Sequence, residues 1–178
     1  PLNPGSPLAQ LGEVYLFEGR PLEARSTLEK SLTYLDKDDA IFIAMAKTDL
    51  AEIALAEGNF NEAFTTLKEA YPFANQHVRR FIVFLCALAG YLVLSKKHKT
   101  DLLTSVQLYG AIEKLSRQAG IGLNVFYQEL NQSRMQQAQK RLSVAEWQKA
   151  YETGSAWDRG EAIERVNELL SRMERDHP

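Results

Sequence analysis

The segment LAQLGEVYLFEGRPLEARSTLEKSL (residues 8–32) returns as KTDLAEIALAEGNFNEAFTTLKEAY (residues 47–71), 39 residues further along the chain. The two copies share, in register, a leucine, a small residue, a second leucine, a Glu-Gly pair, a Glu-Ala pair and a third leucine. A fixed period of 20–50 residues is typical of stacked-repeat proteins, in which each repeat is one supersecondary unit. The repeat therefore predicts a stacked scaffold, and a scaffold of this kind favours binding over catalysis.

Within each copy the apolar residues fall at helical spacing, and the Glu-Gly pair separates two helices. Gly19 and Gly58 permit the turn, and Pro21 suits the first turn of the helix that follows. The small Ala24 marks the point where the first two helices cross closely. The expected fold is all-α, with antiparallel helix pairs over about 6–36, 39–74 and 76–119 and a C-terminal helical extension over about 123–175.

The third unit is degenerate. Leu88-Ala89 aligns with Leu50-Ala51, but Lys96-Lys97-His98-Lys99 stands where the earlier units have Glu-Gly. We expect this basic cluster to be a solvated loop, with contact to an acidic partner as the alternative. Pro72 predicts an end or a bend in the fourth helix because proline is costly inside a helix.

Helix-capping signals occur on both sides of the third unit. Ser143-x-x-Glu146 is a capping-box pattern that opens a short helix, which Gly154 can end, and Asp158-x-x-Glu161 is a capping-box pattern that opens the last helix. Asp38-Asp39 can cap the third helix. The helix over about 123–142 is rich in glutamine, and we expect its glutamines to form an exposed face, with contact to a partner as the alternative.

Length and composition predict one domain over residues 1–178, with a 45% apolar and 25% charged composition typical of globular proteins. A net charge of −2 gives no basic footprint for nucleic acid. The 14-residue apolar run from Phe81 to Leu94 is too short to span a bilayer and predicts a buried helix. The Pro- and Gly-containing first seven residues are typical of a loop cut from a longer protein.

The sequence contains no pattern that indicates catalysis, a cofactor or a metal. It lacks a phosphate-binding loop, and its three histidines are scattered. The single Cys86 excludes an intramolecular disulfide and fits a reducing cytoplasm. Because Cys86 lies inside an apolar run, we expect a buried structural thiol in preference to a nucleophile.

The first two units resemble tetratricopeptide repeats, although their period exceeds the usual ~34 residues and Pro21 replaces an aromatic residue that Phe60 retains. The resemblance implies a right-handed superhelix of antiparallel helix pairs. The small and large contact positions match at Gly12/Ala51, Tyr15/Ala54, Ala24/Ala63, Leu28/Leu67 and Ser31/Ala70.

The C-terminal half resembles the tetratricopeptide regions of bacterial LuxR-type ATP-dependent transcriptional regulators and related signalling ATPases. The matching segments are QLYGAIE (107–113), EWQKAY (146–151) with Gly154, and EAI (161–163). The resemblance implies a non-catalytic regulatory scaffold in the bacterial cytoplasm that binds a protein, a peptide or a small effector. A free-standing peptide-binding adaptor is the alternative. We expect no direct contact with nucleic acid or membrane, and a homodimer could cover the apolar end of the stack.

In tetratricopeptide folds the first helix of each repeat lines a concave, peptide-binding groove. Glu13 and Glu52 would repel a peptide C-terminal carboxylate, which disfavours that class of ligand. Because the third unit's groove face is apolar, we expect the helices with Trp147, Tyr151 and Trp157 to fold back over part of it. The resemblance places in the groove Ala9, Glu13, Leu16, Phe17, Met45, Thr48, Glu52, Leu55, Val83, Cys86, Gly90 and Val93.

Overall fold

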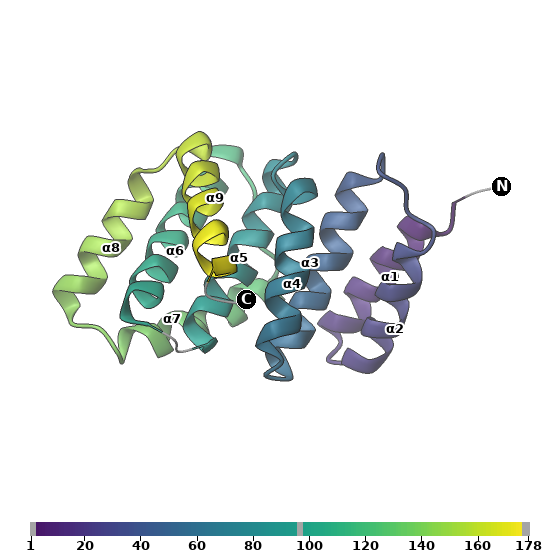
Figure 1. The fold of residues 1–178 in the computed structure, drawn as a ribbon, viewed down its shortest axis with the longest axis horizontal. Coiled ribbons are helices and arrows are strands. Elements are labelled where there is room, and N and C mark those ends of the chain that lie inside the picture. The colour runs from purple at the N-terminus through teal and green to yellow at the C-terminus, as the bar shows by residue number, and fades with distance from the viewer. Residues whose placement is uncertain (1–2, 96–97, 176–178) are drawn as a thin grey trace.

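The computed structural model describes residues 3–95 and 98–175, and over these residues the protein is all-α (Figure 1). The Lys96-Lys97 part of the basic cluster lies outside the described residues. The described part contains nine helices and no strand: α1 (Gly5–Phe17), α2 (Pro21–Leu32), α3 (Ala40–Ala56), α4 (Phe60–Ala74), α5 (Val78–Ser95), α6 (Lys99–Ala119), α7 (Val125–Gln139), α8 (Val144–Ala156) and α9 (Arg159–Arg175).

The first six helices pack as consecutive pairs, α1 with α2, α3 with α4 and α5 with α6, and Figure 1 shows the pairs side by side in one row. Gly19 lies in the turn between α1 and α2, and Gly58 lies in the turn between α3 and α4. Their φ angles are 72° and 75°, which confirms both turns. Such a left-handed backbone costs glycine little because it has no Cβ. Gly12 allows close packing within the first pair, since a Cβ there would lie 2.6 Å from the side chain of Leu28.

Helix α4 passes through Pro72 and ends two residues later at Ala74, which confirms the expected end near this proline. Pro72 is exposed and lies in the last turn of α4, where little helix remains to be disrupted. Two other helices are shorter than the apolar spacing predicts. The second helix ends at Leu32, before residue 36, and α7 covers less than 123–142.

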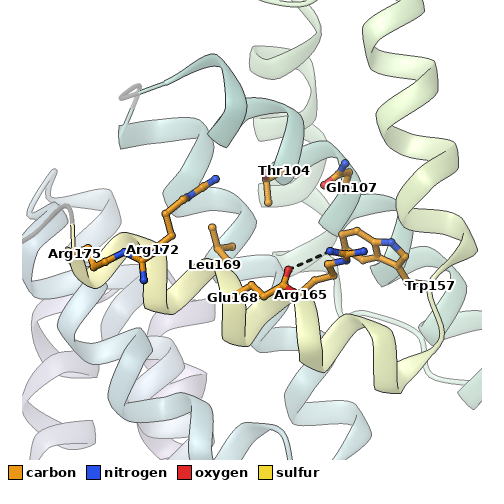
Figure 2. A pocket seen from close by; sticks show the side chains of 8 residues that line it. All are labelled: Thr104, Gln107, Trp157, Arg165, Glu168, Leu169, Arg172 and Arg175. Carbon is orange, nitrogen blue, oxygen red and sulfur yellow. Dashed lines mark hydrogen bonds and ion pairs between the residues drawn. The ribbon is translucent and has the colours of Figure 1, made fainter.

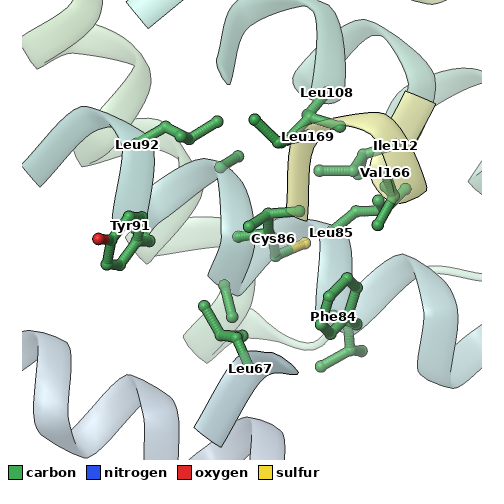
Figure 3. Close-up of a cluster of buried hydrophobic side chains, with 14 of the residues drawn as sticks. Leu67, Phe84, Leu85, Cys86, Tyr91, Leu92, Leu108, Ile112, Val166 and Leu169 are labelled. Carbon is green, nitrogen blue, oxygen red and sulfur yellow. The ribbon is translucent and has the colours of Figure 1, made fainter. Parts of the chain in front are cut away.

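Helix α5 is the centre of the larger apolar core, which Figure 3 shows around Phe84, Leu85 and Cys86. Its residues 81–93 are all buried. By length and composition α5 is apolar enough to cross a membrane, with a mean hydropathy of 1.8, but 72% of that window is buried inside the protein. The apolar run from Phe81 is therefore used for packing between helices.

The last two helices pack on opposite parts of the third pair. Helix α8 lies against α6 on the outer end of the row, and α9 crosses in front of the row in Figure 1. Tyr71 Oη in α4 donates to the backbone oxygen of Ile163 in α9 at 3.2 Å, and Arg172 in α9 pairs with Asp101 in α6 at 2.6 Å. These contacts make the C-terminal extension part of the same packed unit as the repeats.

Gly154 does not end α8, which continues to Ala156. It instead provides the crossing with α6, because a Cβ at Gly154 would lie 1.7 Å from the backbone oxygen of Gln107. Gly110 makes the reciprocal approach, and a Cβ there would lie 2.3 Å from the backbone oxygen of Tyr151. The two glycines therefore let the backbones of α6 and α8 touch.

Both C-terminal capping boxes are confirmed. Ser143 and Glu146 exchange side-chain to backbone hydrogen bonds at the start of α8, and Asp158 and Glu161 do so before α9. Asp39 occupies the N-cap position of α3, as expected, but its side chain makes no capping hydrogen bond to the helix. Its Oδ2 instead accepts from the backbone N–H of Asp36 and organises the preceding loop.

Candidate functional site

Helix α7 lies with one side buried against α1, α3 and α5. We call the residues of those three helices that contact it the inner face: Phe17, Asp49, Glu52, Cys86 and Gly90. The buried side of α7 is mostly polar, and successive members lie three or four residues apart on one face of the helix. That side consists of Tyr127, Asn131, Arg134 and Ala138.

The central contact is a bidentate ion pair between Arg134 and Glu52 of α3. Arg134 Nη1 and Nη2 donate to the two carboxylate oxygens at 3.0 and 2.5 Å. Only 6% of the Arg134 side chain and 2% of the Glu52 side chain are exposed. Burial alone would lower the pKa of Arg134, but the Glu52 carboxylate outweighs it and the pKa is raised. Arg134 therefore keeps its positive charge inside the protein.

Gly90 of α5 provides the space for this pair. A Cβ at Gly90 would lie 2.4 Å from Nη1 of Arg134 and 2.5 Å from its guanidinium carbon. The guanidinium therefore lies directly against the α5 backbone. A side chain at position 90 would therefore force the guanidinium of Arg134 to move.

The second contact joins Tyr127 to Asp49, one turn before Glu52 on α3. Tyr127 Oη donates to Asp49 Oδ1 at 2.7 Å, and Asp49 is almost completely buried. Burial, helped by the nearby negative charge of Glu13, raises the pKa of Asp49 to about 8. Asp49 Oδ2 has no hydrogen-bond partner among the described residues, as suits a carboxyl group that holds its proton at neutral pH.

The third contact involves the cysteine. Asn131 Nδ2 donates to Cys86 Sγ at 3.1 Å. Burial raises the pKa of Cys86 to about 12, so the group is a neutral thiol at physiological pH. Cys86 thus acts as a hydrogen-bond acceptor for α7.

Both ends of α7 are also held. At its start Phe126 and Tyr127 contact Phe17 of α1, with ring centroids 5.0 and 6.3 Å apart. Just after its end, Arg141 Nη1 donates to the backbone oxygen of Val93 at 3.0 Å. The anchoring contacts therefore extend along the whole helix.

The predicted groove residues fall into three groups. Phe17, Glu52, Cys86 and Gly90 contact α7 directly, and Val93 contacts the segment after it through its backbone. Glu13 pairs with Arg80 of α5 at 3.3 Å and lines, with Tyr127, a small cavity of about 160 Å³. The remaining predicted residues are buried: Ala9, Leu16, Met45, Thr48, Leu55 and Val83. Val83 also borders the small cavity.

The expected cover of this face by the helices with Trp147, Tyr151 and Trp157 is wrong, because α7 is the cover. Trp147 and Tyr151 stack on each other with centroids 6.2 Å apart in α8, beyond α6. Trp157 is buried at the junction of α8 and α9. The glutamines of α7 are exposed, as expected: Gln128, Gln132, Gln136, Gln137 and Gln139.

Sequence reasoning missed Asp49, Tyr127, Asn131 and Arg134. Two signals were present. Asp49 and Glu52 lie one turn apart on a mostly apolar helix, and buried acids need donors or a proton. The polar residues of α7 also recur at helical spacing, which indicates a buried polar face once the glutamines are assigned to solvent.

Two of the pockets outside the inner face lie beside α6. Figure 2 shows one of about 350 Å³ between α6 and α9. Its arginines are largely neutralised, since Arg165 pairs with Glu168 and Arg172 with Asp101. The other, of about 340 Å³, lies between α6, α7 and α8.

No group of three or more His, Cys, Asp or Glu residues with metal-binding geometry occurs among the described residues. Comparison of this chain with protein-family models, with curated proteins and with solved structures found no match.

Proposed function

We propose that this chain is a non-catalytic interaction and sensor scaffold, whose tetratricopeptide-like groove holds its own helix α7 in the place of a partner. In this proposal it serves as the C-terminal regulatory part of a bacterial cytoplasmic transcription regulator or signalling ATPase. The observation that carries it is the buried polar contact between α7 and the inner face, centred on Arg134 and Glu52.

This contact differs from ordinary core packing in a way that suits a replaceable helix. A buried ion pair contributes little net stability compared with an apolar contact of the same size, because both charges lose their hydration. It does impose selectivity, since Glu52 accepts only a helix that presents a matching cation. A partner helix with the same spacing of tyrosine, asparagine and arginine would satisfy the same acceptors.

The free-standing adaptor alternative predicts a groove that accepts a peptide without moving α7. The burial of Glu52 and Cys86 beneath α7 favours the self-occupied scaffold. Any partner that uses this face must first displace α7, whose covalent attachment gives it an effective concentration of about millimolar or more.

The test uses a fluorescent peptide of residues 123–142 as the probe. We expect wild-type chain to bind it weakly and Arg134→Ala to bind it at least about tenfold more tightly, because the internal competitor has lost its main contact. Tyr127→Phe weakens the internal helix more mildly and provides a second variant. Gln132→Ala, on the exposed side of α7, should behave as wild type.

The same experiment can also refute peptide binding at the inner face. A peptide with alanine in place of Arg134 should fail to bind, because Glu52 then has no cation. If Arg134→Ala and Tyr127→Phe are both folded by circular dichroism and neither binds the wild-type peptide, the inner face is no peptide groove.

A covalent lock gives an independent check. Asn131→Cys would place a thiol beside Cys86, the only cysteine of the natural sequence. Oxidised Asn131→Cys should exclude the peptide even when combined with Tyr127→Phe, and reduction should restore binding. Equal peptide binding by the oxidised and reduced forms would contradict self-occupation.

A further inference from the structure

Three residues that line the pocket between α6, α7 and α8 carry buried polar atoms with no hydrogen-bond partner among the described residues. Tyr109 Oη, Asn131 Oδ1 and Ser116 Oγ are each buried and without a hydrogen-bond partner in the described part of the chain. All three residues line the same cavity of about 340 Å³. Tyr109 is 3% exposed and Asn131 7%, so little of either residue is in contact with solvent.

Unsatisfied buried polar groups are rare in native proteins, because each one loses its hydration without compensation. Three such groups on residues that line one cavity indicate a ligand that supplies the missing hydrogen bonds. A cavity of this size is within the range of small-molecule sites, which combine an apolar lining with a few converging polar groups. Here Ile112, Leu123 and Met135 supply apolar surface.

The free atoms define the hydrogen bonds that a ligand must make. Asn131 uses its Nδ2 on Cys86, so its remaining Oδ1 can only accept. The hydroxyls of Tyr109 and Ser116 can donate or accept. A matching ligand therefore carries at least one N–H or O–H donor beside an apolar body.

The charges of the residues that line the pocket indicate which charge a ligand can carry. Glu113 is the one charged residue among the described lining residues, and its carboxylate accepts from the hydroxyl of Tyr151 at the α8 side of the pocket. Arg117 pairs with Glu113 at 3.6 Å from outside the lining, so the negative charge of the rim is partly compensated, but no lining residue supplies a cation that would attract an anion.

We propose that this pocket binds a small neutral or cationic molecule with an aromatic or aliphatic body and a hydrogen-bond donor, through Tyr109, Ser116 and Asn131. Because the ligand would touch α6, α7 and α8 together, it would hold α7 in place. The site does not depend on peptide binding at the inner face.

Three probes of one body and different charge test the proposal: indole, tryptamine and indole-3-acetate. Binding is followed by titration with heteronuclear NMR on ¹⁵N-labelled full chain. We expect tryptamine and indole to shift the backbone amides of residues 109–135 saturably. Indole-3-acetate should bind about tenfold more weakly than tryptamine, because of Glu113.

Two near-isosteric variants assign the binding to the unsatisfied hydroxyls. Tyr109→Phe and Ser116→Ala should each weaken tryptamine binding by about fivefold. Neither should lower the melting temperature without ligand, since each removes a hydroxyl that has no partner. Tyr34→Phe, at an exposed position after α2, is the control and should bind as wild type.

The proposal is overturned if none of the three probes gives saturable shifts, or if Tyr109→Phe and Ser116→Ala both bind tryptamine as wild type does. Binding of the carboxylate as tightly as the amine would also contradict it. These variants leave the pair of Arg134 with Glu52 intact, so failure here is separate from failure of the peptide experiment.

Discussion

The buried carboxyl of Asp49 should make stability depend on pH in a direction opposite to that of most aspartates. Four groups face it from four helices: Glu13 in α1, Glu52 in α3, Arg80 in α5 and Tyr127 in α7. Burial raises its pKa most, and the two glutamates add to the effect. The hydrogen bond from Tyr127 and the positive charge of Arg80 oppose it, and the pKa remains at about 8.

The direction of this pH dependence follows from the number of protons that the folded and the unfolded chain bind. Below pH 3.8, the ordinary pKa of aspartate, folded and unfolded chains both hold the proton. Between pH 3.8 and about 8 only the folded chain holds it, so unfolding releases a proton and stability falls as pH rises. At about 1.4 kcal/mol for each pH unit, the loss from about pH 5 to about pH 8 is roughly 3–4 kcal/mol.

Asp49→Asn should remove this dependence, because asparagine keeps an acceptor for Tyr127 and never ionises. Urea denaturation followed by circular dichroism at several pH values measures the free energy of unfolding of both chains. From about pH 5 to about pH 8, the free energy of unfolding of the variant should rise relative to that of wild type by roughly 3–4 kcal/mol. This is a large share of the roughly 5–15 kcal/mol that is typical of a domain. Asp38→Asn, in an exposed loop, should follow wild type at every pH. Parallel profiles for wild type and Asp49→Asn would refute a protonated Asp49.

Three further substitutions probe packing, each through the free energy of unfolding. Arg134→Ala should cost about 3–5 kcal/mol by leaving Glu52 unpaired, whereas exposed Gln132→Ala should stay within about 0.5 kcal/mol; equal effects would mean that the ion pair is unimportant. Gly154→Ala should cost about 1–3 kcal/mol, or more if α8 separates from α6, because its Cβ meets the α6 backbone. Ala24→Leu should cost about 1–3 kcal/mol by overfilling the α1–α2 crossing, and an unchanged melting temperature there would contradict that packing.

The paired helices were predictable because their signals are local. Gly19 and Gly58 are turn residues whatever surrounds them, and apolar spacing of 3.6 residues identifies one buried side of a helix. The capping boxes at Ser143 and Asp158 involve residues three apart in sequence. Each of these depends on contacts within a few residues, so a linear pattern is enough to indicate it.

The role of Gly154 could not be predicted in the same way. A glycine near the end of a helix usually indicates a stop, and locally nothing distinguishes a stop from a close crossing. The difference lies in Gln107, whose backbone oxygen approaches from α6, 47 residues earlier in the chain. Only the packing of two helices decides between the two interpretations.

The all-α class, the turns between paired helices and the burial of α5 can be inferred from the linear sequence, because each follows from local spacing and from the cost of exposing apolar surface. Tertiary structure decided what covers the inner face. Apolar residues indicate burial on their own, and so the sequence pattern favoured the helices with Trp147 and Trp157 as the cover. A polar side chain such as Arg134 can be buried only when a distant partner compensates its lost hydration. That partner, Glu52, lies 82 residues earlier, and only the folded chain brings the two together.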